Sequence, residues 1–310
     1  MKRTILTILV IVIAAAGLRA QNPATPDETY MFAQRDTCDL YLDFYKSPSA
    51  KADAPTVVYV FGGGFKNGTR DKVHARTWFT SLLDKGWNVA SIDYRLGLKG
   101  VKDAGVSKAF IDNLKNAIDI AVEDLYSATA YLVENADALG IDPERIVISG
   151  SSAGAITVLQ AEWYRSRGYS IADTLPDGFH YAGVMGFSGA VLSLRGKARF
   201  GADSCPIAMF HGTDDKIVPY SKIAVLTIHF DGSSQLAKYF RKTSQPYRIY
   251  RIAGHTHEIA DSMNYLTEQV ESFIEEDVIK GLGTRLDETV ENSPIPIPEW
   301  AKADYKSLYD

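Results

Sequence analysis

The sequence RIVISGSSAGAITV, residues 145–158, constrains the fold more than any other stretch of the chain. It opens with β-branched residues typical of a buried strand, and it leads into a helix-compatible run that ends at Trp163. Between the two, Gly150, Ser152 and Gly154 fit the pattern G-x-S-x-G, in which residues without bulk let strand and helix approach each other around a strained serine. Glycine and serine are also common in ordinary turns, but this pattern between a strand and a helix predicts a serine presented for chemistry.

Apolar runs alternate with helix-compatible segments along the rest of the chain. The predicted strands are 39–45, 56–65, 88–96, 146–150, 181–189, 206–212 and 247–254, and the predicted helices are 108–139, 153–163, 222–240 and 259–280. Gly140 fits the C-cap of the first of these helices. Such alternation predicts an α/β fold with a doubly wound, mostly parallel sheet, and 310 residues with 46% hydrophobic content suffice for a single domain of this kind. Catalytic groups in such sheets gather outside the carboxyl ends of the strands.

The chain divides into four predicted segments. Residues 1–20 combine basic residues, a short apolar run and a small final residue, which is typical of a secretory signal peptide and predicts a secreted or periplasmic protein. The apolar run is short for a membrane span, so we expect no stable span after signal removal, with an uncleaved anchor as the alternative. Residues 21–35 form a polar N-terminal lead and 36–281 the catalytic domain. Residues 282–310 form a C-terminal extension without amphipathic period, to which we assign no chemistry.

The charge balance is acidic. The net charge is −5, and it becomes −8 without residues 1–20, which carry three basic residues and no acidic one. We therefore expect no nucleic-acid partner. Cys38 and Cys205 could pair in an oxidising compartment, but the sequence does not place them within bridging distance. No ligand-type spacing surrounds them, so we expect neither a metal nor a cofactor, and the oligomeric state stays open.

A serine nucleophile needs a nearby base that is itself oriented by an acid. Of the six histidines, His255 and His257 follow the last predicted strand, where the base belongs in the chain order Ser, Asp, His. The segment FHGTDDKIVP follows an earlier strand and offers Asp214 and Asp215 as the acid. His211, in the same segment, is more typical of a structural hydrogen-bonding residue.

Three consecutive glycines, Gly62, Gly63 and Gly64, end the predicted strand 56–65. Glycines leave backbone N–H groups open to a substrate, and such donors can stabilise a developing oxyanion. We expect the N–H groups of Gly63 and Gly64 to act with that of Ala153, the residue after the serine.

With these residues assembled, the chain resembles the α/β-hydrolase superfamily, and within it the esterase and lipase branch with an HGGG-type oxyanion loop, which includes bacterial feruloyl and acetyl esterases. The resemblance covers residues 36–280, through the stretches DLYLDFY, VFGGGF, DYRL, DPERIVISGSSAGA, HGTDDKIVP and GHTHEIA in family order. The family's acid pattern, H-G-x-x-D-x-x-V-P, selects Asp215. A glycine three residues before the base selects His257, with His255 as the alternative. Phe61 departs from the family, because it stands where the HGGG histidine would be.

The resemblance implies a single-domain α/β-hydrolase fold and a secreted serine carboxylic ester hydrolase that removes acetyl or feruloyl groups from carbohydrate esters. The expected substrate is a small-molecule or polysaccharide-linked ester, attacked by Ser152 with His257 and Asp215. Two other functions stay open: a serine peptidase of the prolyl-oligopeptidase type, which uses the same three residue types, and a non-catalytic binding protein on a hydrolase scaffold.

Overall fold

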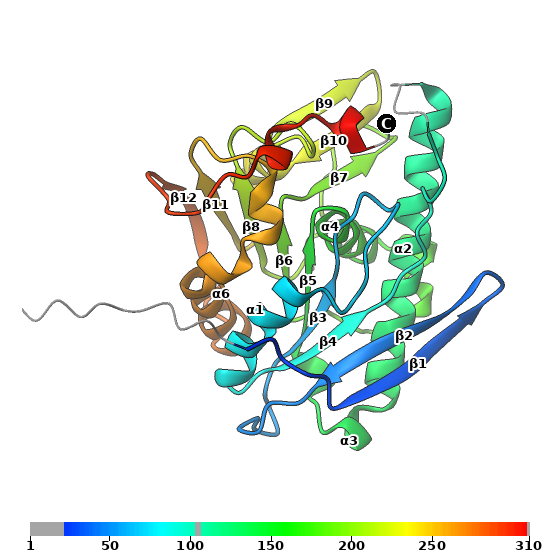
Figure 1. Ribbon diagram of the computed structural model, residues 1–310, viewed down its shortest axis with the longest axis vertical. Coiled ribbons are helices and arrows are strands. Elements are labelled where there is room, and N and C mark those ends of the chain that lie inside the picture. The colour runs from blue at the N-terminus through cyan, green and yellow to red at the C-terminus, as the bar shows by residue number, and fades with distance from the viewer. Residues whose placement is uncertain (1–21, 103–106, 309–310) are drawn as a thin grey trace, which may run out of the picture.

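The computed structural model describes residues 22–102 and 107–308, so the signal peptide predicted for residues 1–20 lies outside the described residues. A nine-stranded sheet forms the centre of this described part, in the order β1-β2-β4-β3-β5-β6-β8-β11-β12 (Figure 1). Its strands are β1 (Glu28–Arg35), β2 (Cys38–Tyr45), β3 (Thr56–Val60), β4 (Asn88–Ile92), β5 (Ile146–Ser151), β6 (Gly183–Phe187), β8 (Ile207–Gly212), β11 (Tyr247–Ile252) and β12 (Arg285–Val290). Strand β2 is antiparallel to both of its neighbours, and every pair from β4 to β12 is parallel. The predicted doubly wound, mostly parallel sheet is confirmed.

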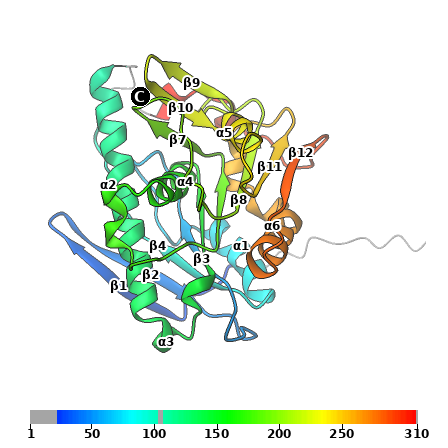
Figure 2. The ribbon, with the colours of Figure 1, turned by 180° about the vertical axis from the view of Figure 1, so that it is seen from behind.

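Helices cover both faces of this sheet (Figures 1 and 2). They are α1 (Val73–Asp84), α2 (Lys108–Glu134), α3 (Ala136–Leu139), α4 (Ala153–Ser166), α5 (Ser233–Phe240) and α6 (Thr267–Phe273), with short helical turns η1 (Pro143–Arg145), η2 (Ser170–Thr174), η3 (His257–Asp261), η4 (Met263–Tyr265), η5 (Ile274–Ile279), η6 (Glu299–Lys302) and η7 (Tyr305–Leu308). A side chain added at Gly183 of β6 would meet Phe273 of α6, whereas one added at Gly186 would meet Leu159 of α4. The two opposite faces of the sheet therefore pack on different layers of helices, and the apolar core lies between the sheet and each layer.

The predicted helix 222–240 is wrong over its first half. Residues 222–232 form two antiparallel strands, β9 (Lys222–Val225) and β10 (Ile228–Gly232), and the helix α5 begins only after them. With β7 (Ala190–Ser193) these strands make a separate three-stranded sheet. The apolar residues of β9 and β10 recur at every second position, which is the period of a strand, and Leu226 makes the turn with φ of 54°.

The ends of the central sheet were not predicted as strands. Strand β1 lies in the segment predicted as a polar lead, and β12 lies in the predicted C-terminal extension. Both are edge strands whose side chains are exposed or partly buried, so little hydrophobic pattern marks them. The predicted helix 259–280 is also interrupted: the chain makes two short turns, η3 and η4, before α6, and Leu266 leaves the helical region with φ of −116°.

Close packing at the turn after β5 confirms the prediction from the two glycines. Ser152 has φ of 52° and ψ of −115°, a strained conformation for a residue with a side chain. A Cβ atom at Gly150 would lie 2.2 Å from the carbonyl oxygen of Gly154, and one at Gly154 would lie 2.0 Å from that of Val60. Only glycine fits at both positions, so strand β3, strand β5 and helix α4 meet directly behind Ser152.

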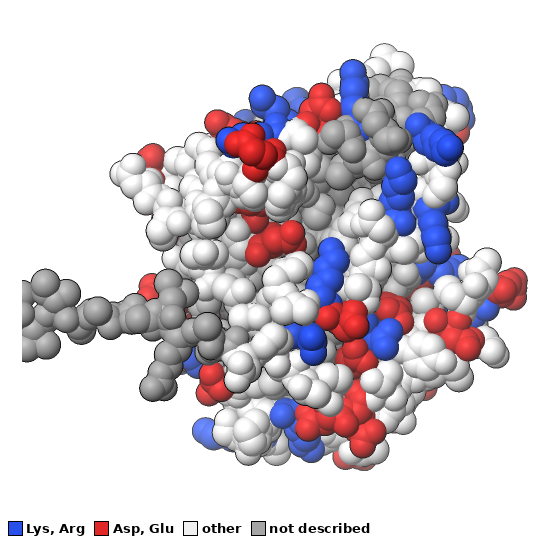
Figure 3. All heavy atoms as spheres, in the orientation of Figure 1, with Lys and Arg blue, Asp and Glu red and all other residues white. Residues whose placement is uncertain are grey.

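Three further features bear on location and partners. Cys38 is exposed and Cys205 is buried, and both are free thiols, so the possible disulfide is not formed. Among residues 22–102 and 107–308, no helix combines the length and apolar character needed to cross a bilayer. On the face shown in Figure 3, acidic and basic side chains lie near one another at several places, with broad uncharged surface between them. The expectation that nucleic acid is not a partner stays a prediction.

Candidate active site

Ser152, His257 and Asp215 form one hydrogen-bonded line at the carboxyl ends of the parallel strands. The Oγ atom of Ser152 lies 2.8 Å from Nε2 of His257, and Nδ1 of the same imidazole lies 2.8 Å from Oδ2 of Asp215. Sheet register explains this meeting. Strand β11 ends with Ile252 paired to Gly212 of β8, so the loops that carry the histidine and the acid begin side by side. All three side chains are nearly buried.

The environment of Asp215 keeps it ionised. Burial raises the pKa of this carboxyl group, but the neighbouring His257 and His211 lower it by more than burial raises it. The net pKa lies well below the usual range for Asp. Its Oδ1 atom also accepts the backbone N–H groups of Ile217 and Val218 at 2.9 and 3.0 Å. An ionised carboxylate only accepts hydrogen bonds, so Nδ1 of His257 carries the hydrogen and Nε2 is left to accept from the Ser152 hydroxyl.

The structure also places the two alternative candidates. His255 is buried, but its Nδ1 lies 2.7 Å from Glu258 Oε1, and its ring makes no hydrogen bond to Ser152 within the described residues. Asp214 is exposed, and its backbone N–H donates to the carbonyl of His255 at 2.9 Å. The hydrogen bond between Asp214 and His255 connects the loop after β8 to the loop after β11. The hydrogen-bonded line to Ser152 contains His257 and Asp215, and neither Asp214 nor His255.

His211 makes the structural hydrogen bonds predicted for it. It is fully buried, with Nδ1 2.8 Å from Ser233 Oγ and Nε2 3.2 Å from both the Val218 carbonyl oxygen and Asp215 Oδ2. The imidazole of His211 therefore contacts the same oxygen of Asp215, Oδ2, that lies beside Nδ1 of His257.

The loop after β3 carries the three glycines to the same place. Strand register pairs Val60 of β3 with Gly150 of β5, so this loop starts beside the turn that presents the serine. The carbonyl of Gly63 accepts the N–H groups of Lys66 and Asn67 at 3.0 and 3.1 Å. Because a trans peptide points its C=O and N–H in opposite directions, these two bonds fix the direction of the Gly64 N–H.

Phe61, which directly precedes the three glycines, is held by an aromatic neighbour. Its ring centroid lies 4.4 Å from that of Tyr94, and the Tyr94 hydroxyl donates to the Phe61 carbonyl at 3.0 Å. Tyr94 thus supports the start of the glycine loop through both its ring and its hydroxyl group.

An apolar hollow of about 510 Å³ opens on one side of Ser152. The hairpin β9–β10 forms much of its wall through directly opposed pairs, Val225 with Ile228 and Ile223 with Phe230. Helix α2 contributes Phe110, Ile111 and Leu114, and the remaining lining includes Ala153, Ile156, Leu192, Ile217 and Val218. Sequence reasoning missed the hairpin wall because it predicted a helix there, although the alternation of apolar residues was a usable signal.

A smaller hollow of about 140 Å³ also borders Ser152, and we call it the polar hollow because most of the side chains that line it are polar. His257 and the three glycines line it with Lys66, Asn67, Lys72, Asp261 and Trp300. Trp300 was also missed, since it lies in the C-terminal extension and nothing in the local sequence relates it to residues so far away along the chain. The two hollows share Ser152 and Gly64, so the serine stands between an apolar and a polar compartment.

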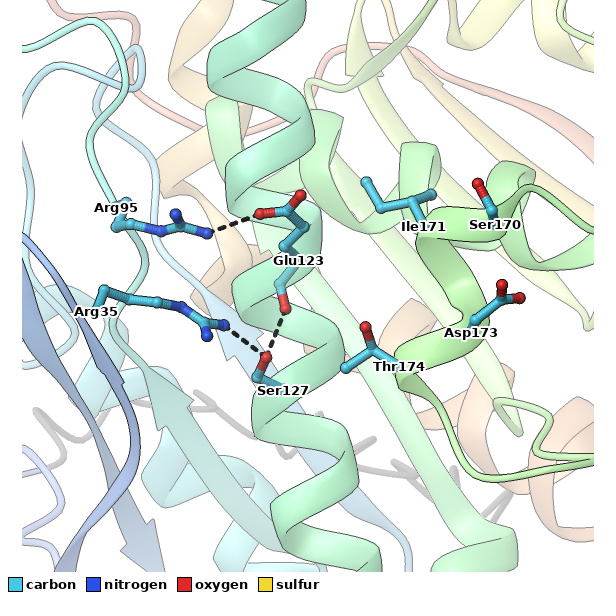
Figure 4. Close-up of a pocket in the computed structure, with 8 residues that line it drawn as sticks. All are labelled: Arg35, Arg95, Glu123, Ser127, Ser170, Ile171, Asp173 and Thr174. Atoms are coloured by element: carbon cyan, nitrogen blue, oxygen red, sulfur yellow. Dashed lines mark hydrogen bonds and ion pairs between the residues drawn. The ribbon is translucent and has the colours of Figure 1, made fainter.

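A second polar hollow, also about 510 Å³, lies between helix α2 and turn η2 and includes none of the three residues of the line (Figure 4). Its arginines are occupied: Arg95 contacts Glu123 at 2.9 Å and Arg35 donates to Ser127 at 2.7 Å (Figure 4). Both also pair with the buried Asp124, so we assign this hollow no chemistry. In the described residues, no group of three or more His, Cys, Asp or Glu side chains is arranged to hold a metal ion.

Comparison with known proteins gives two family matches. The phospholipase/carboxylesterase family matches residues 109–268, just over half of the chain, and the BD-FAE family matches residues 42–162. The first match includes Ser152, Asp215 and His257, and the second includes the glycine loop.

Individual relatives agree with these families. Lipase 2 of Moraxella sp. (strain TA144) is 32% identical over 145 residues, which are 45% of this chain and 29% of that protein. Carboxylesterase NlhH of Mycobacterium tuberculosis is 30% identical over 131 residues, 42% of this chain and 36% of that protein. The chain thus matches about a third of the length of these two relatives.

Solved structures share the fold. Esterase 2 from Thermogutta terrifontis with bound propionate has a TM-score of 0.56 and 21% identity, over 80% of this chain and 93% of that one. Its butyrate-bound form has a TM-score of 0.57 and 20% identity, over 80% and 93%. The predicted single-domain α/β-hydrolase fold is confirmed.

Proposed function

Because the chain belongs to the phospholipase/carboxylesterase family, we propose that it is a serine hydrolase of carboxylic esters. The observation that carries this proposal is the continuous line from Asp215 through His257 to Ser152, whose serine opens on two hollows. A nucleophile, a base and an orienting acid in this arrangement suit acyl transfer.

The reaction proceeds in two halves. The Oγ atom of Ser152 attacks the ester carbonyl while its proton passes to Nε2 of His257, and Asp215 stabilises the imidazolium that forms. The carbonyl oxygen becomes an oxyanion, which accepts hydrogen bonds from the N–H groups of Gly63, Gly64 and Ala153. The C–O bond breaks, His257 gives its proton to the leaving alcohol, and an acyl-serine remains. Water then attacks this intermediate with His257 as base, which releases the acid and restores the serine.

The position of His257 supports a proposal for which hollow holds each half of the ester. The leaving oxygen must approach Nε2 to receive the proton, so the alcohol belongs in the polar hollow that His257 lines. The acyl group then lies in the apolar hollow beside Ala153. An acetyl group would leave most of that space empty, whereas an aromatic or medium-chain acyl group would cover its apolar walls.

We therefore propose esters of carbohydrates as substrates, with feruloyl preferred over acetyl. The small polar hollow suits an alcohol rich in hydroxyl groups, and the large apolar hollow suits an aromatic acid. The signal-like residues 1–20 support action outside the cytoplasm, secreted or periplasmic, where plant polysaccharides are met.

The proposed activity is tested on p-nitrophenyl acetate, butyrate and octanoate, methyl ferulate and acetylated xylan. We expect hydrolysis with kcat/KM highest for the larger apolar acyl groups. An enzyme that cleaved none of these esters but did cleave aminoacyl amides would be the serine peptidase, and a protein that turned over neither would be the binding scaffold.

The hairpin wall gives a prediction for acyl preference. In the double variant Ile223→Ser, Val225→Ser, we expect the ratio of kcat/KM for the octanoate to that for the acetate to fall about tenfold, because a long chain loses apolar contact that a short one never makes. The matched control is Leu226→Ser, since Leu226 sits at the tip of the same hairpin, 95% exposed, and lines neither hollow. An unchanged ratio in the double variant, or an equal fall in the control, would place the acyl group elsewhere.

A further inference from the structure

The C-terminal segment, residues 292–308, crosses the mouth of the site and contributes to both hollows. Trp300 lines the polar hollow, and Asp304 and Tyr305 line the apolar one. Figure 1 shows this segment, in red, running from beside η3 across to the sheet of β7, β9 and β10. Both family matches end before it begins, at residues 162 and 268.

Buried residues of its own anchor the segment. Ala301 is fully buried and Ile295 nearly so. The N–H of Ala301 donates to the carbonyl of Pro298 at 3.1 Å and closes turn η6, which packs against η3. Turn η6, which carries Trp300, is therefore held against η3, the turn that carries His257.

Trp300 differs from the other tryptophans of the chain in its exposure. The side chains of Trp78, Trp87 and Trp163 are buried, whereas Trp300 is 50% exposed. Its ring stands at 87° to the imidazole of His257, with the centroids 6.5 Å apart. The exposed half of this indole contributes little to core packing. Its aromatic surface beside His257 is one that a bound ligand can cover.

Most of the other side chains that line this hollow carry hydrogen-bonding groups. The hollow is also lined by Lys66 and Asn67, by Lys72, which donates to the Gly62 carbonyl at 3.4 Å, and by the carboxylate of Asp261. An open aromatic face among such donors and acceptors matches the chemistry of a sugar ring, which presents C–H groups on its faces and hydroxyl groups around its rim.

We propose that Trp300 determines the specificity for the leaving alcohol by stacking on the ring of a sugar while the neighbouring polar groups bind its hydroxyls. This inference rests on the proposed ester hydrolysis and on the assignment of the polar hollow to the alcohol. Trp300 contacts the substrate and takes no part in proton transfer.

The test keeps the acyl group constant and changes the alcohol. The two substrates are methyl ferulate and 5-O-feruloyl-L-arabinose, and the variants are Trp300→Ala, Trp300→Phe and the control Ile297→Ala. Ile297 lies in the same segment and lines neither hollow. Thermal unfolding of each variant reports whether the segment stays in place.

For Trp300→Ala we expect KM for the sugar ester to rise about tenfold, which corresponds to the loss of one aromatic contact, with kcat changed less than about threefold. KM for methyl ferulate should stay within about twofold, because a methyl group cannot reach the indole. Trp300→Phe keeps an aromatic face and should restore most of the sugar preference, and Ile297→Ala should behave as wild type.

The outcomes separate this inference from the proposed function. If wild type cleaves both esters and Trp300→Ala raises both KM values equally or neither, the sugar site is refuted while the esterase stands. Cleavage of methyl ferulate without cleavage of the sugar ester refutes it too. If neither ester is cleaved, or cleavage survives in Ser152→Ala, the proposed function fails first.

Discussion

Replacing Ser152 with alanine is expected to lower kcat/KM for every ester that the wild type cleaves by at least about 10³-fold. Without Oγ no acyl-serine forms, and the remaining rate comes only from water held near the oxyanion donors. KM should change little by comparison, because both hollows keep their lining. The rate is measured on p-nitrophenyl butyrate at several protein concentrations, so that a trace of contaminating esterase is detected.

The matched control for this variant is Ser149→Ala, on strand β5, which leads into the turn that carries Ser152. The Ser149 hydroxyl is buried and has no hydrogen-bond partner within the described residues, so its removal deletes the same atom at no cost to the site. Its activity should stay within about twofold of wild type. A Ser152→Ala enzyme that kept more than a tenth of the wild-type rate would show that another group attacks the ester.

Replacing His257 with alanine should lower kcat/KM as far as Ser152→Ala does, whereas His255→Ala should keep most of the activity. The reason is geometric: Nε2 of His257 lies 2.8 Å from Ser152 Oγ, while His255 is bonded to Glu258. Groups that act as one unit give non-additive losses, so the double variant Ser152→Ala, His257→Ala should be no slower than either single variant.

His255→Ala is expected to affect stability instead. It leaves the buried carboxylate of Glu258 with fewer hydrogen bonds, and such a loss costs about 1 to 3 kcal/mol of unfolding free energy. Urea unfolding of both histidine variants separates this effect from catalysis. If His255→Ala lost more activity than His257→Ala while remaining folded, the base would be assigned wrongly.

Short-range sequence patterns selected Ser152, Asp215 and His257, which the structure brings within hydrogen-bonding distance of one another. The spacing of Gly150, Ser152 and Gly154 reflects a local steric need, since a Cβ at either glycine would collide with backbone oxygens. The loops after β8 and β11 follow from the rule that functional residues sit at carboxyl strand ends, and register then brings them together.

The walls of the two hollows were missed for different reasons. Residues 222–232 carry apolar residues at every second position, a strand signal that the predicted helix overrode, and pairing with β7 and between β9 and β10 fixes them as strands. Trp300 reaches the site only because the chain after β12 returns across the sheet, and no local pattern encodes that return. The residues predicted for chemistry thus belong to short local motifs, whereas those that shape the substrate space do not.

The most direct test of the central claim is covalent labelling with a fluorophosphonate, followed by digestion and mass mapping of the modified peptide. The account predicts one adduct, on Ser152, formed at a rate that falls strongly in His257→Ala and that is unaffected in Ser149→Ala. An adduct on another residue, such as the adjacent Ser151, or full esterase activity after complete treatment without an adduct on Ser152, would contradict the assignment of Ser152 as the nucleophile.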